Sequence, residues 1–318
     1  MRSLSKTAGA LSLSLAALFG TAAGANPAVP DNPLDDPVWH DRLAPLIKNK
    51  TIRNAREQCV PVANIGRVRG SPVKNDAQAI VDVMKRTKLT AGLIDTFART
   101  GGTFCFMDFD KEYGRTSLSG AGGVYYHEGN AVALNTSKEL GLGRGCQVML
   151  TIHETEHLRQ EHSGFGFPKD PVESALTEYI GAIESDAHTI ETIGSWMLAQ
   201  PQYSSAVYND ALDCLSVKRE GVAYKSQAAD LLKNIVRTHP DWIDNGQAAR
   251  QIYGFIRNND DFQWNYLGMG IKWTFDCDNN DSCLQQKNTL KDLGMDVHKI
   301  GAMHYPENYL DRPLLPNP

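Results

Sequence analysis

Two histidines and a glutamate lie within five residues of one another, at His153, Glu154 and His157. Residues four apart in a helix lie on one face, so both imidazoles can reach a single ion at zinc–nitrogen distances of about 2.0–2.1 Å. Glu154 is rotated about 100° from His153 around the helix axis, so its carboxylate can face a water on that ion without binding the ion. This H-E-x-x-H spacing predicts a zinc site with Glu154 as general base acting through a metal-activated water.

The elements around the motif predict how it is positioned. Apolar residues at 148, 149, 152 and 158 favour a buried helix, and the pattern over 78–99 favours another helix. Residues 101–109 read as a strand and 123–135 as a hairpin, whereas residues 171–200 predict a second helix after a Gly-rich loop. We expect an α+β, mainly helical core over residues 78–200, in which a small antiparallel sheet or hairpin packs on the motif helix.

The motif, the hairpin before it and the second helix after it resemble the zincin metallopeptidases, and most of all bacterial metallopeptidase families that have not been characterised. The resemblance covers about residues 100–200. It implies zinc-dependent hydrolysis of peptide bonds, with a strand such as Ala131–Leu134 at the rim of the cleft to pair with an extended peptide. The stretch Glu184–Ala187 also resembles an E-x-D-A segment found at this place in those families.

A catalytic zinc ion usually has three protein ligands and one open position, so a third ligand is required. The metzincin pattern would place a histidine where this chain has Ser163, which leaves the helix over 171–200. On a helical wheel Asp186 lies near the centre of the apolar stripe, where a buried carboxylate is costly unless a cation or several hydrogen bonds compensate it. We therefore predict that Asp186 completes the site with His153 and His157.

A second interpretation stays open. Asp186 would then orient one of the two histidines, and Glu184 or Glu178 would bind the metal. The gluzincin families use a glutamate ligand with an aspartate four residues later, but Ala182 stands four residues before Asp186. The wheel places the remaining polar residues of this helix on a solvated face: Glu173, Glu184, His188 and Glu191.

The N-terminus and the charge balance predict where the protein works. The chain has 318 residues, with 32 basic and 37 acidic side chains. Residues 1–25 combine Arg2 and Lys6, an apolar run and a small-residue end at Ala25, the order of a secretory signal peptide cut after Ala25. Its removal takes away two basic residues, leaving 30 against 37 and a net charge of −7. We expect a secreted or periplasmic protein with no other membrane span and no affinity for nucleic acid.

The cysteine count fits an exported protein. All six cysteines follow the predicted signal peptide, which favours up to three disulfides. The polar loop between Cys277 and Cys283 predicts a local bridge, and the other pairings stay open: Cys59, Cys105, Cys146 and Cys214.

Two functions follow from these patterns. The first is a secreted or periplasmic zinc metallopeptidase that acts on a peptide or protein substrate. The alternative is a non-catalytic, metal-stabilised binding or effector domain of the same fold, which the missing E-x-x-x-D pair motivates. Residues 26–77 are predicted to be extended or partly helical, and residues 201–318 to form a helical lid or second lobe.

Overall fold

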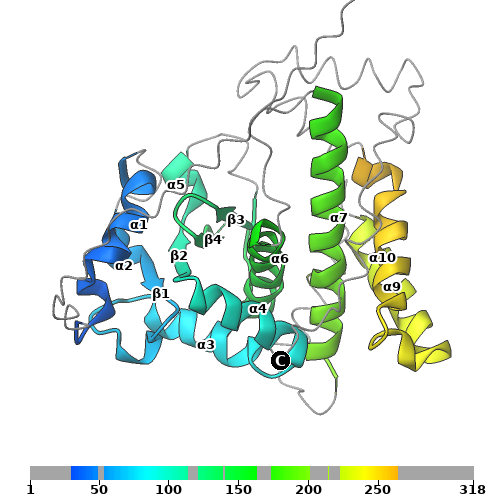
Figure 1. Cartoon of the computed structure of the whole chain (residues 1–318), viewed down its shortest axis with the longest axis horizontal. Coiled ribbons are helices and arrows are strands. Elements are labelled where there is room, and N and C mark those ends of the chain that lie inside the picture. Colours follow the sequence, from blue (N-terminus) through cyan, green and yellow to red (C-terminus); the bar gives the residue numbers. More distant parts are fainter. Residues whose placement is uncertain are drawn as a thin grey trace, which may run out of the picture.

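The computed structural model describes residues 30–48, 54–113, 121–138, 140–162, 173–200, 214 and 223–263. The fold of this part of the chain is mainly helical with one small sheet, as predicted (Figure 1). Its elements in chain order are η1 (Pro33–Asp35), α1 (Pro37–Lys48), α2 (Ala55–Gln58), β1 (Cys59–Pro61), η2 (Ile65–Arg67), α3 (Lys74–Met84), α4 (Lys88–Arg99), β2 (Thr103–Met107), α5 (Phe109–Tyr113), β3 (Gly123–Tyr126), β4 (Ala131–Asn135), α6 (Arg144–His162), α7 (Glu173–Leu198), α9 (Ala223–Thr238), η4 (Pro240–Trp242) and α10 (Gln247–Arg257).

The sheet has four strands in the order β1-β2-β4-β3. The predicted hairpin is present as the antiparallel pair β3 and β4, but β2 pairs parallel with β4, so the sheet is mixed rather than antiparallel. The expectation that Ala131–Leu134 forms the rim is wrong, because β4 is hydrogen-bonded to a strand on both sides. Among the described strands, β3 and β1 form the two edges.

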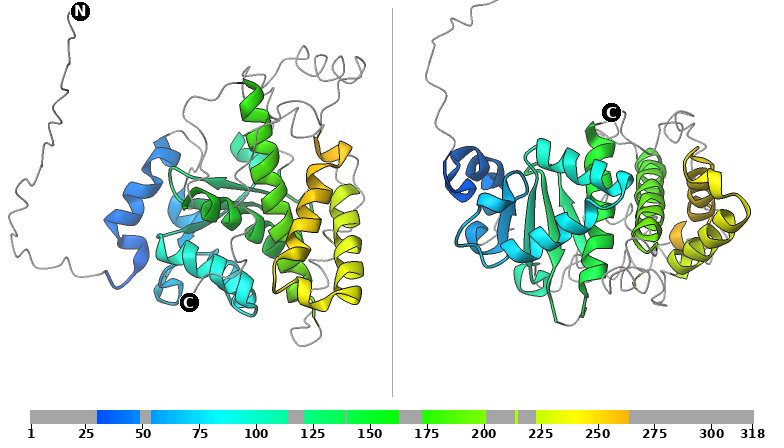
Figure 2. Two further views of the ribbon diagram at one scale, coloured as in Figure 1. Left: turned by 45° about the vertical axis from the view of Figure 1, so that its right-hand side comes forward. Right: turned by 90° about the horizontal axis from the view of Figure 1, so that it is seen from below.

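The helices are arranged in successive layers beside the sheet. Helix α6 packs on β3 and β4, α7 packs on α6, and α9 and α10 cover the far side of α7 (Figures 1 and 2). One continuous hydrophobic core runs through these layers, from Leu34 beside α1 to Phe262 after α10. The regions predicted as 26–77, 78–200 and 201–318 therefore share a core in the part of the chain that the structure describes.

The helix predicted over 78–99 is two helices. Helix α3 ends at Met84, and α4 begins at Lys88 with Thr87 as its N-cap. The Thr87 side chain accepts a hydrogen bond from the backbone N–H of Thr90, which satisfies an amide at the start of the new helix. Both helices bury an apolar face, so the apolar pattern of the sequence runs across both helices. It therefore did not indicate the break before Thr87.

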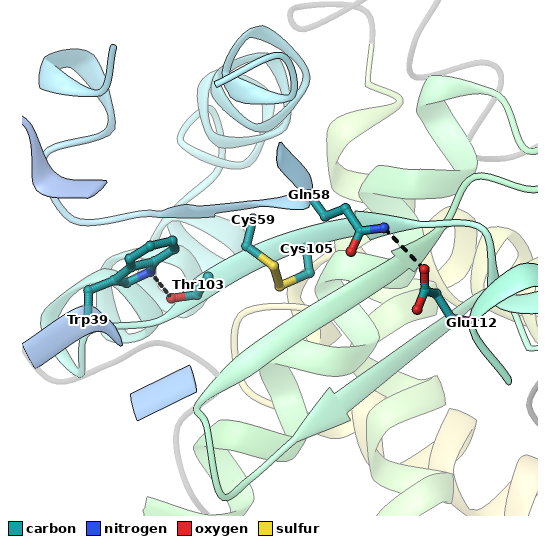
Figure 3. Close-up of a disulfide and its surroundings, with 6 residues drawn as sticks. All are labelled: Trp39, Gln58, Cys59, Thr103, Cys105 and Glu112. Atoms are coloured by element: carbon teal, nitrogen blue, oxygen red, sulfur yellow. Dashed lines mark hydrogen bonds between the residues drawn. A yellow bond between two sulfur atoms is a disulfide. The ribbon is translucent and has the colours of Figure 1, made fainter. Parts of the chain in front are cut away.

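Two disulfides link the described cysteines. Cys59 and Cys105 are opposite each other in the register of β1 and β2, and both are fully buried (Figure 3). In the same view the Trp39 indole donates to Thr103 Oγ1 at 3.0 Å, which fixes α1 to β2. The predicted partners Cys277 and Cys283 lie outside the described residues.

The second disulfide ties the first turn of α6 to the chain before α9. Cys146 and Cys214 are 68 residues apart in sequence, with Cα atoms 5.5 Å apart. Cross-links that close loops of this length restrict the unfolded chain strongly, by about 4 kcal/mol in the chain-entropy treatment. The segment that leads into α9 is thus covalently held to the helix that carries the motif.

Among the described residues no helix is both long and apolar enough to span a bilayer.

Candidate metal centre

The H-E-x-x-H motif lies in the middle of α6, where the helix is covered by the sheet and by α7. His153 and Glu154 are only 7% and 6% exposed, and Glu156 is fully buried. Burying several ionisable groups on one helix is unfavourable unless each finds an opposite charge or a hydrogen bond. The partners come mostly from α7, which runs alongside.

Glu184 on α7 faces both histidines. Its carboxylate oxygens lie 3.3 Å from His153 Nε2 and 3.5 Å from His157 Nε2, and the two Nε2 atoms are 3.2 Å apart. Four ligands around a tetrahedral ion with bonds of about 2.0–2.1 Å are about 3.3–3.4 Å from one another. The two Nε2 atoms and the Glu184 carboxylate therefore lie about as close together as ligands of one tetrahedral ion, with Oε2 nearer His153 and Oε1 nearer His157.

A second group on α7 widens the set of possible ligands. His153, Glu184 and His188 are all buried, and each offers a ligand atom within 4.8 Å of the others. This buried group could hold a metal ion. His188 is already bonded through both ring nitrogens, by Nδ1 to Glu191 Oε2 at 2.5 Å and by Nε2 to the Tyr224 hydroxyl at 3.0 Å.

The outer nitrogen of each motif histidine is fixed by a hydrogen bond. His153 Nδ1 lies 3.1 Å from Glu191 Oε2, and His157 Nδ1 lies 2.9 Å from Gln160 Oε1. Both partner oxygens are acceptors, so each Nδ1 donates and each Nε2 is turned toward the shared space. Partners of this kind fix the tautomer and orientation of metal-binding histidines.

Asp186 contacts Gln160, the residue that is bonded to His157. Its Oδ2 accepts from Gln160 Nε2 at 2.9 Å, and the same amide donates to the backbone carbonyl of Ile183. Asp186 also shares a hydrogen bond with Glu156, which Arg159 pairs at 2.6 Å. Burial raises the pKa of Glu156 well above its ordinary value, so Glu156 supplies the proton of that bond.

The pKa values of His153 and Glu184 are shifted by burial and by the charged groups packed around them. Burial alone would lower the pKa of His153, but its bonds to Glu184 and Glu191 outweigh this effect and raise the pKa to about 10. Burial opposes ionisation of Glu184, yet the adjacent imidazoles lower its pKa to about 2. The metal-free site thus holds a proton between these groups, and a cation that binds there must displace it.

Glu154 lies apart from this cluster, against the edge strand. A Cβ atom on Gly123 of β3 would be 3.2 Å from Glu154 Oε1 and 3.3 Å from its Cγ. Burial raises the pKa of Glu154, although His153 and His157 partly offset that effect. The absence of a side chain at position 123 leaves room for this carboxylate between α6 and β3.

No family model, curated protein or solved structure matches the chain.

The two histidines that the sequence singled out, His153 and His157, lie with their Nε2 atoms 3.2 Å apart, but the carboxylate beside them differs from the preferred one. Glu184 is the carboxylate at the two imidazoles, whereas Asp186 bonds Gln160 and Glu156. The geometry favours the second interpretation of Asp186, as a residue that orients a histidine. Glu178 is in the first turns of α7, where the side chains lie outside the described part of the structure.

The expectation of a solvated polar face on α7 is wrong. Every residue from 180 to 195 is buried, because α6 covers one side of the helix and α9 and α10 cover the other. Glu184, His188 and Glu191 are spaced at i, i+4 and i+7, so they form one stripe that faces the motif. That spacing was visible in the sequence, but a wheel with one apolar face assumes that the opposite face meets water.

Proposed function

We propose that the protein is a zinc-dependent metallopeptidase whose metal is bound by His153, His157 and Glu184. The observation that carries this proposal is the close approach of the three groups. The two Nε2 atoms are 3.2 Å apart, and Glu184 Oε2 and Oε1 lie 3.3 Å from His153 Nε2 and 3.5 Å from His157 Nε2, respectively. Two imidazoles and a carboxylate with one open position form a ligand set typical of catalytic zinc. The bonds from Glu191 and Gln160 support it, since they aim both Nε2 lone pairs at the same point.

His157 fits the role of ligand better than His188. Its Nε2 atom faces Glu184 and His153, while His188 uses both nitrogens in bonds to Glu191 and Tyr224. Burial and the nearby Lys225 charge lower the pKa of His188 to about 3, so it is neutral with its one proton toward Glu191. His188 Nε2 then accepts a hydrogen bond from the Tyr224 hydroxyl, so His188 contributes to the site through its bond to Glu191.

Zinc in this position would polarise a substrate carbonyl and lower the pKa of a water molecule. Glu154 is the residue of the motif that can take the proton of that water, and its raised pKa makes it a better base near neutral pH than an ordinary carboxylate. Its place beside Gly123 holds the carboxylate between α6 and the sheet edge. The same carboxylic acid can then return the proton to the leaving amine.

An extended peptide is the substrate that the neighbouring strand suits. Strand β3 is an edge of the sheet, with β4 as its one strand partner among the described residues. Its free side can therefore hydrogen-bond an extended backbone as an added strand. The position of β3 directly over Glu154 would bring such a peptide to the proposed metal site.

Zinc loading and peptide cleavage test this function together. Purified protein is expected to bind one zinc ion per chain and to cleave an unfolded protein such as reduced, alkylated casein. A chelator should abolish cleavage and added zinc should restore it. Zinc binding without any turnover across a broad peptide library would instead identify a non-catalytic, metal-stabilised domain, and cleavage indifferent to chelator would exclude the proposed chemistry.

The Gly123→Ala substitution tests the placement of Glu154. The new methyl group would be 3.2 Å from the carboxylate and would push it from its position. Because displacements of about 1 Å can cost about 100-fold in rate, we expect kcat/KM to fall at least tenfold while zinc content stays at one per chain. The readouts are steady-state kinetics and metal analysis.

Gly254→Ala is the matched control. It adds the same methyl group inside helix α10, where no atom lies within 4 Å of the new Cβ. Its kinetics should equal those of the wild type. Equal activity in Gly123→Ala as well would show that Glu154 does not depend on this gap.

The cysteine pairs bear on where the protein works. Two disulfides fit an oxidising compartment outside the cytoplasm. We propose export through the signal peptide predicted over residues 1–25, followed by action in the periplasm or outside the cell.

A further inference from the structure

Glu191 is a buried acid of α7 that contacts the proposed zinc ligand His153. Its side chain is 1% exposed and lies within hydrogen-bond distance of three nitrogen donors. Oε2 accepts from His153 Nδ1 and His188 Nδ1, while Oε1 accepts from Lys225 Nζ at 3.1 Å. Two of these donors are imidazole rings, and the third is the ammonium group of Lys225.

Lys225 is the cation paired with Glu191. Its ammonium nitrogen lies 3.1 Å from Glu191 Oε1, and its side chain is 18% exposed against 1% for Glu191. A buried carboxylate without an opposite charge is strongly unfavourable in its position. Loss of Lys225 would therefore let Glu191 move away from His153 Nδ1.

Lys225 belongs to α9, which follows the Cys146–Cys214 disulfide and packs on the outer side of α7 (Figure 2). The neighbouring residue Tyr224 is 1% exposed and donates to His188 Nε2. Two adjacent residues of one helix therefore reach through the α7 layer to the ring and carboxylate that support His153. The sequence predicted only a helical lid or second lobe for residues 201–318 and assigned none of these residues to the metal site.

We propose that Lys225 is a positioning residue for the zinc site, which acts through Glu191 to hold His153 in its metal-binding orientation; this inference rests on the function proposed above. Lys225 touches neither the ligand atoms nor the substrate edge. It holds Glu191 Oε1, so that Oε2 stays directed at His153 Nδ1. Helix α9 is thereby part of the metal site, and zinc affinity depends on its docking.

Zinc affinity measured by chelator competition at pH 7 tests this inference. Lys225→Met keeps the length of the side chain and removes its charge, and it should weaken zinc binding by about 10- to 100-fold, the range for loss of a second-layer partner. Lys225→Arg should bind within a few-fold of the wild type. Lys233→Met is the matched control, because Lys233 is on the same helix but exposed and paired with Asp230 at 3.1 Å; it should bind like the wild type.

A double-mutant cycle with Glu191→Gln shows whether the effect travels through Glu191. In that background Lys225→Met should change zinc affinity by less than about twofold, because the charge that it balances is gone. Lys225→Gln, which keeps a donor, gives the same comparison if Lys225→Met alone does not fold. Far-UV circular dichroism of the metal-free variants separates loss of fold from loss of affinity.

The outcomes separate this inference from the proposed function. Wild-type protein that binds zinc tightly while Lys225→Met binds it equally well would overturn the role of Lys225 and leave the peptidase proposal intact. The same loss of affinity with and without Glu191 would overturn the route through that carboxylate. Wild-type protein that binds no zinc would overturn both.

Discussion

Replacing Glu184 by glutamine is expected to weaken zinc binding by more than about 100-fold, beyond the usual cost of losing a second-layer partner. The glutamine keeps the size of the side chain but removes the negative charge between His153 Nε2 and His157 Nε2. Zinc then retains two imidazoles and a weak amide oxygen. The measurement is chelator competition at pH 7, with metal content after dialysis as a second readout.

Asp186→Asn is the matched control for this substitution. The amide oxygen of the asparagine would still accept a hydrogen bond from Gln160 Nε2, so the orientation of His157 is largely kept. We expect a loss of zinc affinity below about tenfold, smaller than for a ligand. A greater loss in Asp186→Asn than in Glu184→Gln would return the role of third ligand to Asp186.

Replacing Glu154 by glutamine is expected to lower kcat by about 10²–10⁴-fold, the range for removal of a general base. Glutamine cannot take a proton, but it fits the space beside Gly123 as the carboxylate does. Zinc content should stay at one per chain, since Glu154 lies outside the three ligand atoms. The measurement is the rate of peptide cleavage by zinc-loaded protein at saturating substrate, which gives kcat.

The control for Glu154 is Glu57→Gln, which makes the same substitution on helix α2. Glu57 is exposed, and α2 packs on β1 and β2. Its removal should leave kcat within about twofold of the wild type. Wild-type hydrolysis in Glu154→Gln would contradict the mechanism, because the other carboxylate of the motif, Glu156, is bonded to Arg159 and Asp186.

The motif helix was the part of the site that local spacing could predict. His153 and His157 are four residues apart on one helix, and that relation depends only on helical geometry. The hairpin at 123–135 was also local, since its turn and alternation lie within thirteen residues. The parallel pairing of β2 with β4 was not local, and nothing in either strand's own sequence distinguishes it from an antiparallel pairing.

The sequence favoured Asp186 over Glu184 because of an assumption about solvent. The wheel assigned Glu184, His188 and Glu191 to water because they lie opposite the apolar stripe of α7. In the structure the polar stripe faces the motif on α6, and α9 and α10 cover the far side of α7. Both sides of α7 are therefore buried. Lys225 and Tyr224 could not be predicted either, because their partners on α7 are more than thirty residues away.

The most direct test of the zinc site is a crystal structure of the zinc-loaded protein with an anomalous difference map collected at the zinc edge. We expect one peak per chain, with His153 Nε2, His157 Nε2 and a Glu184 oxygen about 2.0–2.2 Å from it. A peak bound by His188 or Asp186 in place of His157 or Glu184, or no peak in this cluster at all, would contradict the proposed metal centre.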